Sequence, residues 1–264
     1  ASQADVMQAR WGTHGDRPVI AFVPASIPEC FEMTVDAFNL SERYRLPVFV
    51  LLDEVLGHMR EPFIPPHQED IKVENRKHPS VYKLYNPREY LPYKHTEDDV
   101  PAMSAFGDDY RFHVTGLFHD ETGFPTNDPK EIDKKMRRLM RKVDNNRGDI
   151  LKWEERELED ADYLILAYGS TSRTAASAVD DLREEGKKVG LLRPQVIWPF
   201  PEERLRELAE RVKAILVPEM NMGQIVLEVE RVVAGRARVK SLGRVDGELL
   251  TPEEIRHAVL EVME

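Results

Sequence analysis

Short, nearly continuous apolar runs alternate with amphipathic stretches in two parts of this 264-residue sequence. In the first part, Pro18–Pro24 and Pro47–Leu52 have the length and branched residues of strands, and 26–44 carries apolar residues at helical spacing. Ser26 and Glu29 form a capping-box pattern where that helix would begin. This order predicts a right-handed βαβ unit whose parallel strands are buried on both faces. Because one such unit cannot bury its own sheet, we expect the chain to begin partway through a domain whose earlier strands precede it.

The alternation becomes more regular after Asp162. We expect strands there at Tyr163–Ala167, Val189–Leu192, Ala214–Val217 and Val239–Leu242, with helices over 175–185, 202–211 and 223–233. Strands that alternate with helices of this length predict a compact, doubly wound α/β domain over 151–264.

Prolines interrupt the pattern between these two parts. Seven of them fall between Glu61 and Val114, which predicts an irregular connector, since proline disrupts both helices and sheet ladders. Lys130–Arg147 then reads as a helix with eight Lys or Arg against three Asp or Glu. We favour a solvated helix that joins two domains; a docking face for an acidic partner is the alternative. The predicted division is therefore 1–62, 63–150 and 151–264.

Composition excludes several classes of protein. The sequence holds 37 Lys or Arg and 48 Asp or Glu, a formal net charge of −11, which argues against a general nucleic-acid binder. Its single cysteine, Cys30, cannot form an intrachain disulfide or a cysteine-bound iron–sulfur cluster. We find neither an apolar stretch of membrane-spanning length nor a signal-peptide pattern, and therefore expect a cytoplasmic protein.

Two loops that follow predicted strands in the C-terminal part carry polar candidates. Ser170 and Thr171 could present hydroxyl and backbone N–H groups to an anion at a helix start, although we favour a simple helix cap. Asn221 and Gln224 lie in the second loop, where they could serve as hydrogen-bonding groups. Packing of that loop against a neighbouring domain is at least as probable, so both loops are candidates for an anion site or an interface.

The N-terminal part carries a second set of candidates. Asp53 and Glu54 end a predicted strand, where paired carboxylates can act as acid and base, although adjacent residues of an extended chain point to opposite faces. Thr13 and His14 lie in a loop flanked by glycines, and such loops often approach ligands closely. For His14 we weigh a role near cofactor or substrate evenly against a structural one.

His119–Glu121 superficially resembles a set of metal ligands. Consecutive residues of one loop rarely converge on a single ion, so a polar, hydrogen-bonded turn is the better interpretation. The sequence predicts no metal site in this chain.

Eight short motifs are spread in order over nearly the whole chain. They are Gln3–Asp16, Pro28–Phe31, Ala37–Glu42, Asp53–Glu61, Thr115–Glu121, Trp198–Pro201, Glu219–Gln224 and Leu242–Arg244. Together they resemble the alpha subunit of 2-oxoacid:ferredoxin oxidoreductases. The 2-oxoglutarate type is the most similar, and enzymes of branched-chain 2-oxoacids are the next candidates.

The resemblance implies both a fold and a reaction. It implies the C-terminal part of a pyrimidine-binding thiamine domain, a connector, and a domain like the C-terminal domain of transketolase. The reaction would be oxidative decarboxylation of a 2-oxoacid with coenzyme A, giving acyl-CoA and carbon dioxide while ferredoxin is reduced. The family's catalytic Glu lies upstream of Ala1, so no catalytic residue is assigned here.

The same resemblance implies how the cofactor and the subunits are divided. Thiamine diphosphate would be shared with a beta subunit, which is expected to hold the diphosphate, its magnesium and an iron–sulfur cluster. We expect a dimer of heterodimers, with further small subunits as an option, and no turnover by the isolated chain. A subunit of another thiamine-dependent enzyme (transketolase-like or a 2-oxoacid dehydrogenase) and a non-catalytic assembly module are the alternatives.

Overall fold

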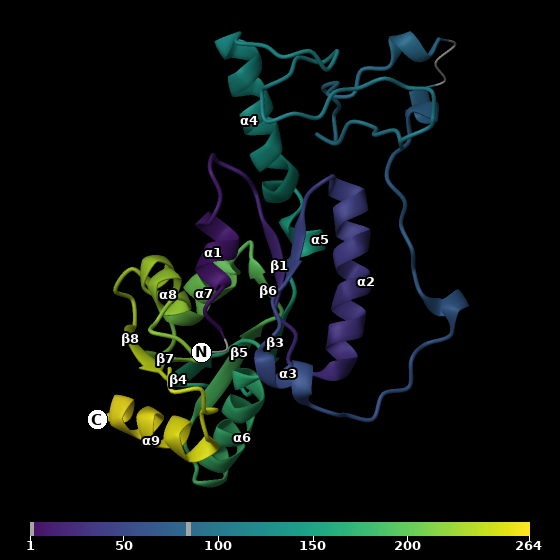
Figure 1. Ribbon diagram of the computed structural model, residues 1–264. Helices are drawn as coiled ribbons and strands as arrows, with labels where there is room; N and C mark the ends of the chain where they lie inside the picture. Colours follow the sequence, from purple (N-terminus) through teal and green to yellow (C-terminus); the bar gives the residue numbers. More distant parts are fainter. Residues whose placement is uncertain (1–2, 83–85) are drawn as a thin grey trace.

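The computed structural model describes residues 3–82 and 86–264. Figure 1 shows two α/β units side by side and, at one end, a lobe of loops carried by a long helix. Within the described part of the chain, none of the helices combines the length and the apolar character that a membrane span requires.

The first unit contains a three-stranded sheet with the order β2-β1-β6. Strands β1 (Ile20–Phe22) and β2 (Val48–Val50) are parallel, and helix α2 (Ile27–Tyr44) joins them, which confirms the predicted βαβ unit. Strand β6 (Val196–Trp198) pairs antiparallel with β1 and comes from the C-terminal part of the sequence. The predicted boundary at residue 151 therefore does not separate the two sheets.

Helix α2 covers one face of this sheet, and α1 (Val6–Trp11) packs against the other. The prediction that both strands are buried on both faces is wrong for β2, whose residues are only half-buried. The reason is its place at the edge of the described sheet, where it pairs on one side only with β1.

The N-terminus of α2 keeps half of the predicted capping box. The hydroxyl of Ser26 accepts a hydrogen bond from the backbone N–H of Glu29, as expected. The Glu29 carboxylate instead accepts from the backbone N–H of Ala25, 2.7 Å away, and reaches Arg193 of the second unit. Glu29 thus joins the start of α2 to the second unit.

The second unit is built on a five-stranded sheet with the order β3-β5-β4-β7-β8. Four strands are parallel, and β3 runs antiparallel at the edge. The strands are β3 (Trp153–Arg156), β4 (Tyr163–Leu166), β5 (Val189–Pro194), β7 (Ala214–Glu219) and β8 (Arg238–Gly243).

Helices cover both faces of the second sheet, which confirms the doubly wound prediction. Helices α6 (Thr171–Glu184) and α9 (Pro252–Met263) pack on one face, and α7 (Glu202–Ala209) and α8 (Ile225–Val233) lie on the other together with α1. Helix α6 begins four residues earlier than predicted, so Thr171 and Ser172 belong to its first turn.

The connector is irregular, as predicted. After α3 (Glu54–His58), its described residues form short 3₁₀ turns at η1 (Gln68–Asp70), η2 (Pro79–Tyr82) and η3 (Pro87–Glu89) and an isolated β-bridge between His119 and Pro125. The charged helix is α4 (Pro129–Asp144), followed by α5 (Arg147–Ile150). We use the name connector lobe for residues 86–128, which stand at the top of Figure 1 beside α4.

Three basic side chains attach the connector lobe and α4 to the first unit. Arg45, the left-handed residue that ends α2, donates to the backbone carbonyls of Pro92 and Pro101, each 3.0 Å away. Arg138 of α4 donates to the carbonyl of Tyr93 at 2.8 Å. Lys142 donates to the carbonyl of Tyr44 at 2.6 Å, and burial lowers its pKa to about 7.

The cations of Lys130–Arg147 are therefore largely structural. Six of the eight contact other groups of the chain: Lys135, Arg137, Arg138, Arg141, Lys142 and Arg147. This favours the predicted joining helix over the docking face.

Candidate functional site

The order of the second sheet creates a switch point between β4 and β7. From β4 the chain crosses to β5 on one side, and from β7 it crosses to β8 on the other. Open α/β sheets bind ligands in the crevice outside the carboxyl ends of such strands. The loops that follow β4 and β7 contain the predicted candidates Ser170 and Asn221, so we describe this crevice first.

The crevice is filled by Gln3, a residue from the other end of the chain. Its side-chain Nε2 donates to the carbonyl of Tyr168 at 3.0 Å, and its Oε1 accepts from the backbone N–H of Met220 at 3.0 Å. Asn221 Nδ2 donates to the Gln3 carbonyl at 2.8 Å, and the hydroxyl of Thr171 reaches Gln3 Oε1 at 3.3 Å. The switch point thus binds the chain's own N-terminal segment.

Asp53 closes the crevice from the side of the first unit. It follows β2, is only 5% exposed, and its Oδ2 accepts from both the backbone N–H and the hydroxyl of Ser170 at 2.6 Å. Gln3 Nε2 donates to the same oxygen at 3.1 Å. Burial raises the pKa of Asp53, and the hydrogen bonds from Ser170 oppose that rise.

Gly169 is required for this contact. Its φ of +57° lies in the left-handed region, and a Cβ there would stand 2.6 Å from Asp53 Oδ2. A larger residue would push the carboxylate away from the start of α6.

Glu219 occupies the second helix start at the switch point. This fully buried carboxylate accepts from the backbone N–H groups of Gln224, Ile225 and Val226 at 2.9–3.1 Å, at the N-terminus of α8. The hydroxyl of Tyr168 donates to it at 2.8 Å. Burial and then the charge of Glu219 raise the pKa of Tyr168 well above its usual value. Glu219 therefore takes the place that an anionic ligand would need.

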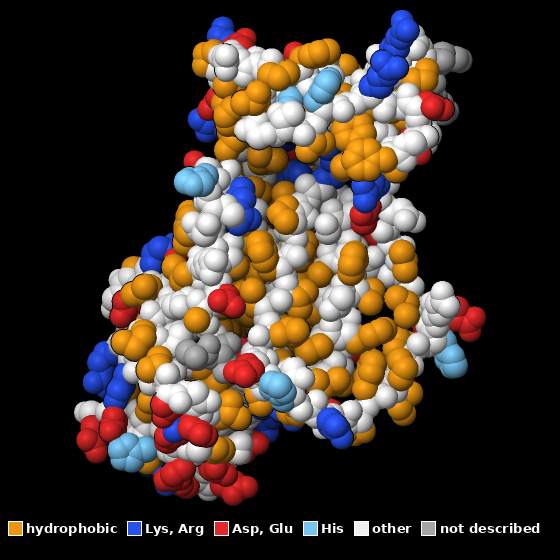
Figure 2. All heavy atoms as spheres, viewed as in Figure 1, with side chains coloured by type: hydrophobic (Ala, Val, Ile, Leu, Met, Phe, Trp, Pro, Cys, Tyr) orange, Lys and Arg blue, Asp and Glu red, His pale blue; other side chains and the backbone are white. Residues whose placement is uncertain are grey.

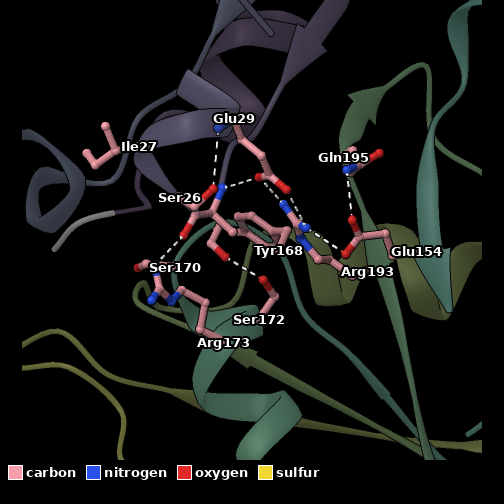
Figure 3. Close-up of polar contacts among 12 residues, drawn as sticks. Ser26, Ile27, Glu29, Glu154, Tyr168, Ser170, Ser172, Arg173, Arg193 and Gln195 are labelled. Atoms are coloured by element: carbon pink, nitrogen blue, oxygen red, sulfur yellow. Dashed lines mark hydrogen bonds and ion pairs between the residues drawn. The ribbon is translucent and has the colours of Figure 1, made fainter. Parts of the chain in front are cut away.

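A pocket of about 490 Å³ lies beside this crossing, between the N-terminal turns of α2 and α6. Arg193 of β5 lines this pocket, and Figure 3 shows it paired with Glu29 and with Glu154, whose Oε2 lies 2.7 Å from Arg193 Nη1. Arg173 pairs with Glu61 on the other wall at 2.5 Å. Burial by itself would raise the pKa of Glu29, but the hydrogen bond from Arg193 lowers it. Both arginines are thus held by carboxylates of the first unit.

Comparisons with known proteins agree with the resemblance noted in the sequence. A family model described as "Pyruvate flavodoxin/ferredoxin oxidoreductase, thiamine diP-bdg" matches residues 1–138. A second, "Pyruvate:ferredoxin oxidoreductase core domain II", matches residues 161–255. The chain belongs to the 2-oxoacid:ferredoxin oxidoreductase family. The predicted family is therefore confirmed.

Relatives and a solved structure show which members of the family this chain is similar to. The chain is 47% identical, over 99% of its length, to 2-oxoglutarate synthase subunit KorA of Methanothermobacter thermautotrophicus, of which it spans 68%. It is 33% identical to a ketoisovalerate oxidoreductase subunit of Methanothermobacter marburgensis, covering 98% of this chain and 65% of that protein. A 2-oxoglutarate:ferredoxin oxidoreductase structure from Magnetococcus marinus matches all of this chain and 45% of its own chain, with TM-score 0.85 and 32% identity.

The candidates of this oxidoreductase family member fall into two separate groups. Asp53 and Ser170 contact each other directly, and Thr171 and Asn221 contact Gln3. Gln224 holds the N-terminal segment, since its Nε2 donates to the carbonyl of Ala4 at 2.8 Å. These residues form contacts within the chain, and Ser170 makes no side-chain capping hydrogen bond at the start of α6.

The other candidates lie apart from this crossing. Thr13 and His14 are exposed in the loop that precedes β1, where the hydroxyl of Thr13 accepts from Arg17. Because β1 and β2 are parallel, that loop lies at the opposite end of the sheet from Asp53. Glu54 is exposed and pairs with His58 at 3.8 Å, so it does not share a site with Asp53. A ligand contact of His14 stays a prediction.

Sequence reasoning missed Gln3, Tyr168 and Glu219 as site residues. Glu219 carried a signal, since it is an acid at the end of an apolar strand just before a helix. Gln3 begins the first of the family motifs, but that motif did not indicate its contacts with Tyr168 and Met220, which lie more than 160 positions away. In residues 3–82 and 86–264, no group of three or more His, Cys, Asp or Glu side chains is arranged to hold a metal ion.

Proposed function

We propose that this chain is the alpha subunit of a 2-oxoglutarate:ferredoxin oxidoreductase. The reaction converts 2-oxoglutarate and coenzyme A into succinyl-CoA, carbon dioxide and one proton, and passes two electrons to ferredoxin. The observation that carries the proposal is the identity of 44–47% to three 2-oxoglutarate synthase subunits over nearly the whole chain. The related structure, with 2-oxoglutarate, coenzyme A and succinyl-CoA bound, supports the same substrates.

Thiamine diphosphate would supply a carbanion that attacks the oxo carbon and then takes up the electron pair. The helix starts of the second unit do not fit its diphosphate, since Asp53 sits on α6 and Glu219 on α8. The proposal therefore assigns the pyrimidine side of the cofactor to the part of the chain that matches the thiamine-binding family model. It assigns the diphosphate, its magnesium and the iron–sulfur cluster to a partner beta subunit.

The role of this chain's own residues is to fix one wall of that shared site. The contacts of Asp53 and Gln3 hold the carboxyl ends of β2, β4 and β7 together. A wall held by buried hydrogen bonds excludes water, which strengthens electrostatic interactions in the site. We further propose a cytoplasmic complex with ferredoxin as acceptor, two alpha and two beta subunits, and room for further small subunits.

A branched-chain 2-oxoacid is the second candidate substrate. It is favoured by the 31–33% identity to two ketoisovalerate oxidoreductase subunits over 98% of this chain. That identity is lower than the identity to the 2-oxoglutarate enzymes, so we place this substrate second.

A substrate panel tests the proposal. The complete gene product, purified with its co-purifying subunits, is assayed for coenzyme A-dependent ferredoxin reduction with 2-oxoglutarate, 2-oxoisovalerate and pyruvate. We expect kcat/KM to be highest for 2-oxoglutarate. A higher value with 2-oxoisovalerate would select the second candidate, and no reduction with any 2-oxoacid would exclude the oxidoreductase.

A further inference from the structure

A histidine of the connector lies between a serine and an aspartate. Nδ1 of His78 is 3.0 Å from the hydroxyl oxygen of Ser80, and its Nε2 is 3.0 Å from Oδ2 of Asp108, which comes from the connector lobe. We call these three residues the His78 cluster. A hydroxyl within hydrogen-bond reach of a base, with the base held by a third group, is the arrangement that activates a serine as a nucleophile.

The backbone determines which nitrogen of the neutral imidazole carries the proton. The backbone N–H of Ser80 donates to His78 Nδ1 at 3.2 Å, and an N–H group can only donate, so Nδ1 presents its lone pair. The proton is then on Nε2, which donates to Asp108. His78 is therefore oriented to accept the proton of the Ser80 hydroxyl as a general base.

Asp108 is held as a carboxylate beside His78. Its Oδ2 also accepts from the backbone N–H of Ala105 at 2.7 Å. This hydrogen bond, and after it the one with His78, lowers the pKa of Asp108. The ring of Tyr110 lies edge-on to the imidazole, with 5.9 Å between centroids. The negative charge of Asp108 would stabilise the imidazolium that forms when His78 takes up a proton.

A pocket of about 640 Å³ adjoins the cluster, and His78 is one of its lining residues. Phe106 and Phe112 line it as well, with their rings stacked at 6.2 Å between centroids. Figure 2 shows hydrophobic side chains gathered on the connector lobe, at the top of that view. Glu42 and Arg76, which also line the pocket, pair with each other at 2.6 Å. The pocket therefore suits an uncharged, apolar group better than an ion.

We propose that Ser80, His78 and Asp108 form a hydrolytic centre that cleaves esters of small, uncharged carboxylic acids. Ser80 is exposed, so its hydroxyl is accessible from solvent. The acyl group would occupy the apolar pocket beside His78. This activity goes beyond the proposed function and does not depend on it.

The reaction needs water as its only co-reactant. Ser80 Oγ forms a bond to the carbonyl carbon of the ester while its proton passes to His78 Nδ1. The bond from that carbon to the alcohol oxygen then breaks, and His78 gives the proton to the departing alcohol. Water attacks the acyl-serine in the same way, the bond to Ser80 Oγ breaks, and the carboxylic acid leaves as Ser80 regains a proton.

The test uses the complete complex, with p-nitrophenyl butyrate as substrate and a fluorophosphonate as a label for activated serines. We expect saturable release of p-nitrophenol and a fluorophosphonate adduct on Ser80, located by peptide mass spectrometry. Ser80→Ala should abolish both. His78→Asn and Asp108→Asn should each lower kcat/KM for the ester at least about 100-fold. Ser177→Ala is the matched control, since Ser177 is an exposed serine of α6, and it should leave both readouts unchanged.

Two results would overturn the inference: no label on Ser80 in the unmodified complex, or ester hydrolysis that survives Ser80→Ala. A cluster that only fastens the connector to its lobe would give the first result, and its variants would lower Tm without any labelling to lose. The ester assay contains neither a 2-oxoacid nor coenzyme A, so its outcome is separate from that of the substrate panel.

Discussion

Asp53→Ala should destabilise the chain strongly, because the side chain accepts hydrogen bonds from buried donors of two distant segments. Its loss leaves the backbone N–H of Ser170 and the amide of Gln3 without this acceptor. A buried donor left unsatisfied costs about 1–3 kcal/mol. The free energy of unfolding should therefore fall by about 2–6 kcal/mol, the sum for two such donors.

Two companion variants sharpen this prediction. Glu54→Ala removes the adjacent carboxylate, which is exposed and pairs only loosely with His58, so it should cost less than about 0.5 kcal/mol. Asp53→Asn keeps an acceptor oxygen and removes a buried charge, so it should cost less than about 1 kcal/mol near neutral pH.

The pH dependence of Asp53→Asn has a defined sign. Burial raises the pKa of Asp53 above its usual value, so the folded state binds its proton more tightly than the unfolded state does. The ionised group therefore opposes folding above its folded pKa, and this penalty disappears as the pH falls to the unfolded value. The stability of Asp53→Asn relative to the natural chain should thus decrease on acidification.

Urea unfolding followed by tryptophan fluorescence measures all three variants, since Trp198 is buried in β6 next to α1 and donates to the carbonyl of Val6. The reasoning is refuted if Asp53→Ala costs no more than Glu54→Ala. In that case the crossing of the two units would not depend on this carboxylate.

Further changes test other contacts. Gly169→Ala should destabilise by about 2–4 kcal/mol, since φ is +57° and the new Cβ would meet a carboxylate oxygen at 2.6 Å; Gly247→Ala, with φ +90° and open space, should cost about 1 kcal/mol. Equal costs in urea unfolding would contradict this. Burial alone would raise the pKa of Glu29, but Arg193 lowers it. The Glu29–Arg193 pair therefore stabilises the fold at pH values above the pKa of Glu29 in the unfolded chain, and this stabilisation is lost as the pH falls through the pKa of Glu29 in the folded chain. Arg193→Met should flatten that acid loss in urea titrations; an unchanged slope would count against the pair. His14→Ala in the complete complex should lower turnover more than Tm, since His14 is exposed, and unchanged kinetics would leave it a structural role.

The strands that form the core could be predicted because their apolar runs are long and continuous. Tyr163–Ala167 and Ala214–Val217 were found this way, and both lie within a residue or two of β4 and β7. Strand β3 was missed because its residues Trp153–Arg156 are exposed and mostly charged, so no apolar pattern marks an edge strand of this kind.

Other elements were missed for different physical reasons. Strand β6 has only three residues and immediately follows β5, so its role in a different sheet cannot be read from local sequence. Helix α9 did carry a local signal, since Thr251 and Glu254 form a capping box at its start. That helix follows the strand which we expected to complete the domain.

The candidate site could be predicted only in pieces. Asp53 and Ser170 were each chosen because they follow a strand, but they are 117 positions apart and their contact depends on how the two sheets pack. The position of Gln3 in the crevice could not be predicted for the same reason, because the residues that it contacts there, Tyr168 and Met220, are far from it in the sequence.

The central claim is that this chain supplies one side of a site shared with another subunit. The direct measurement is a titration of the complete, separately purified alpha chain with its beta subunit, following 2-oxoglutarate-dependent ferredoxin reduction with coenzyme A. The account predicts no turnover by either protein alone and a rise that saturates at one beta subunit per alpha chain. Turnover by the alpha chain alone, or none at any ratio, would contradict it.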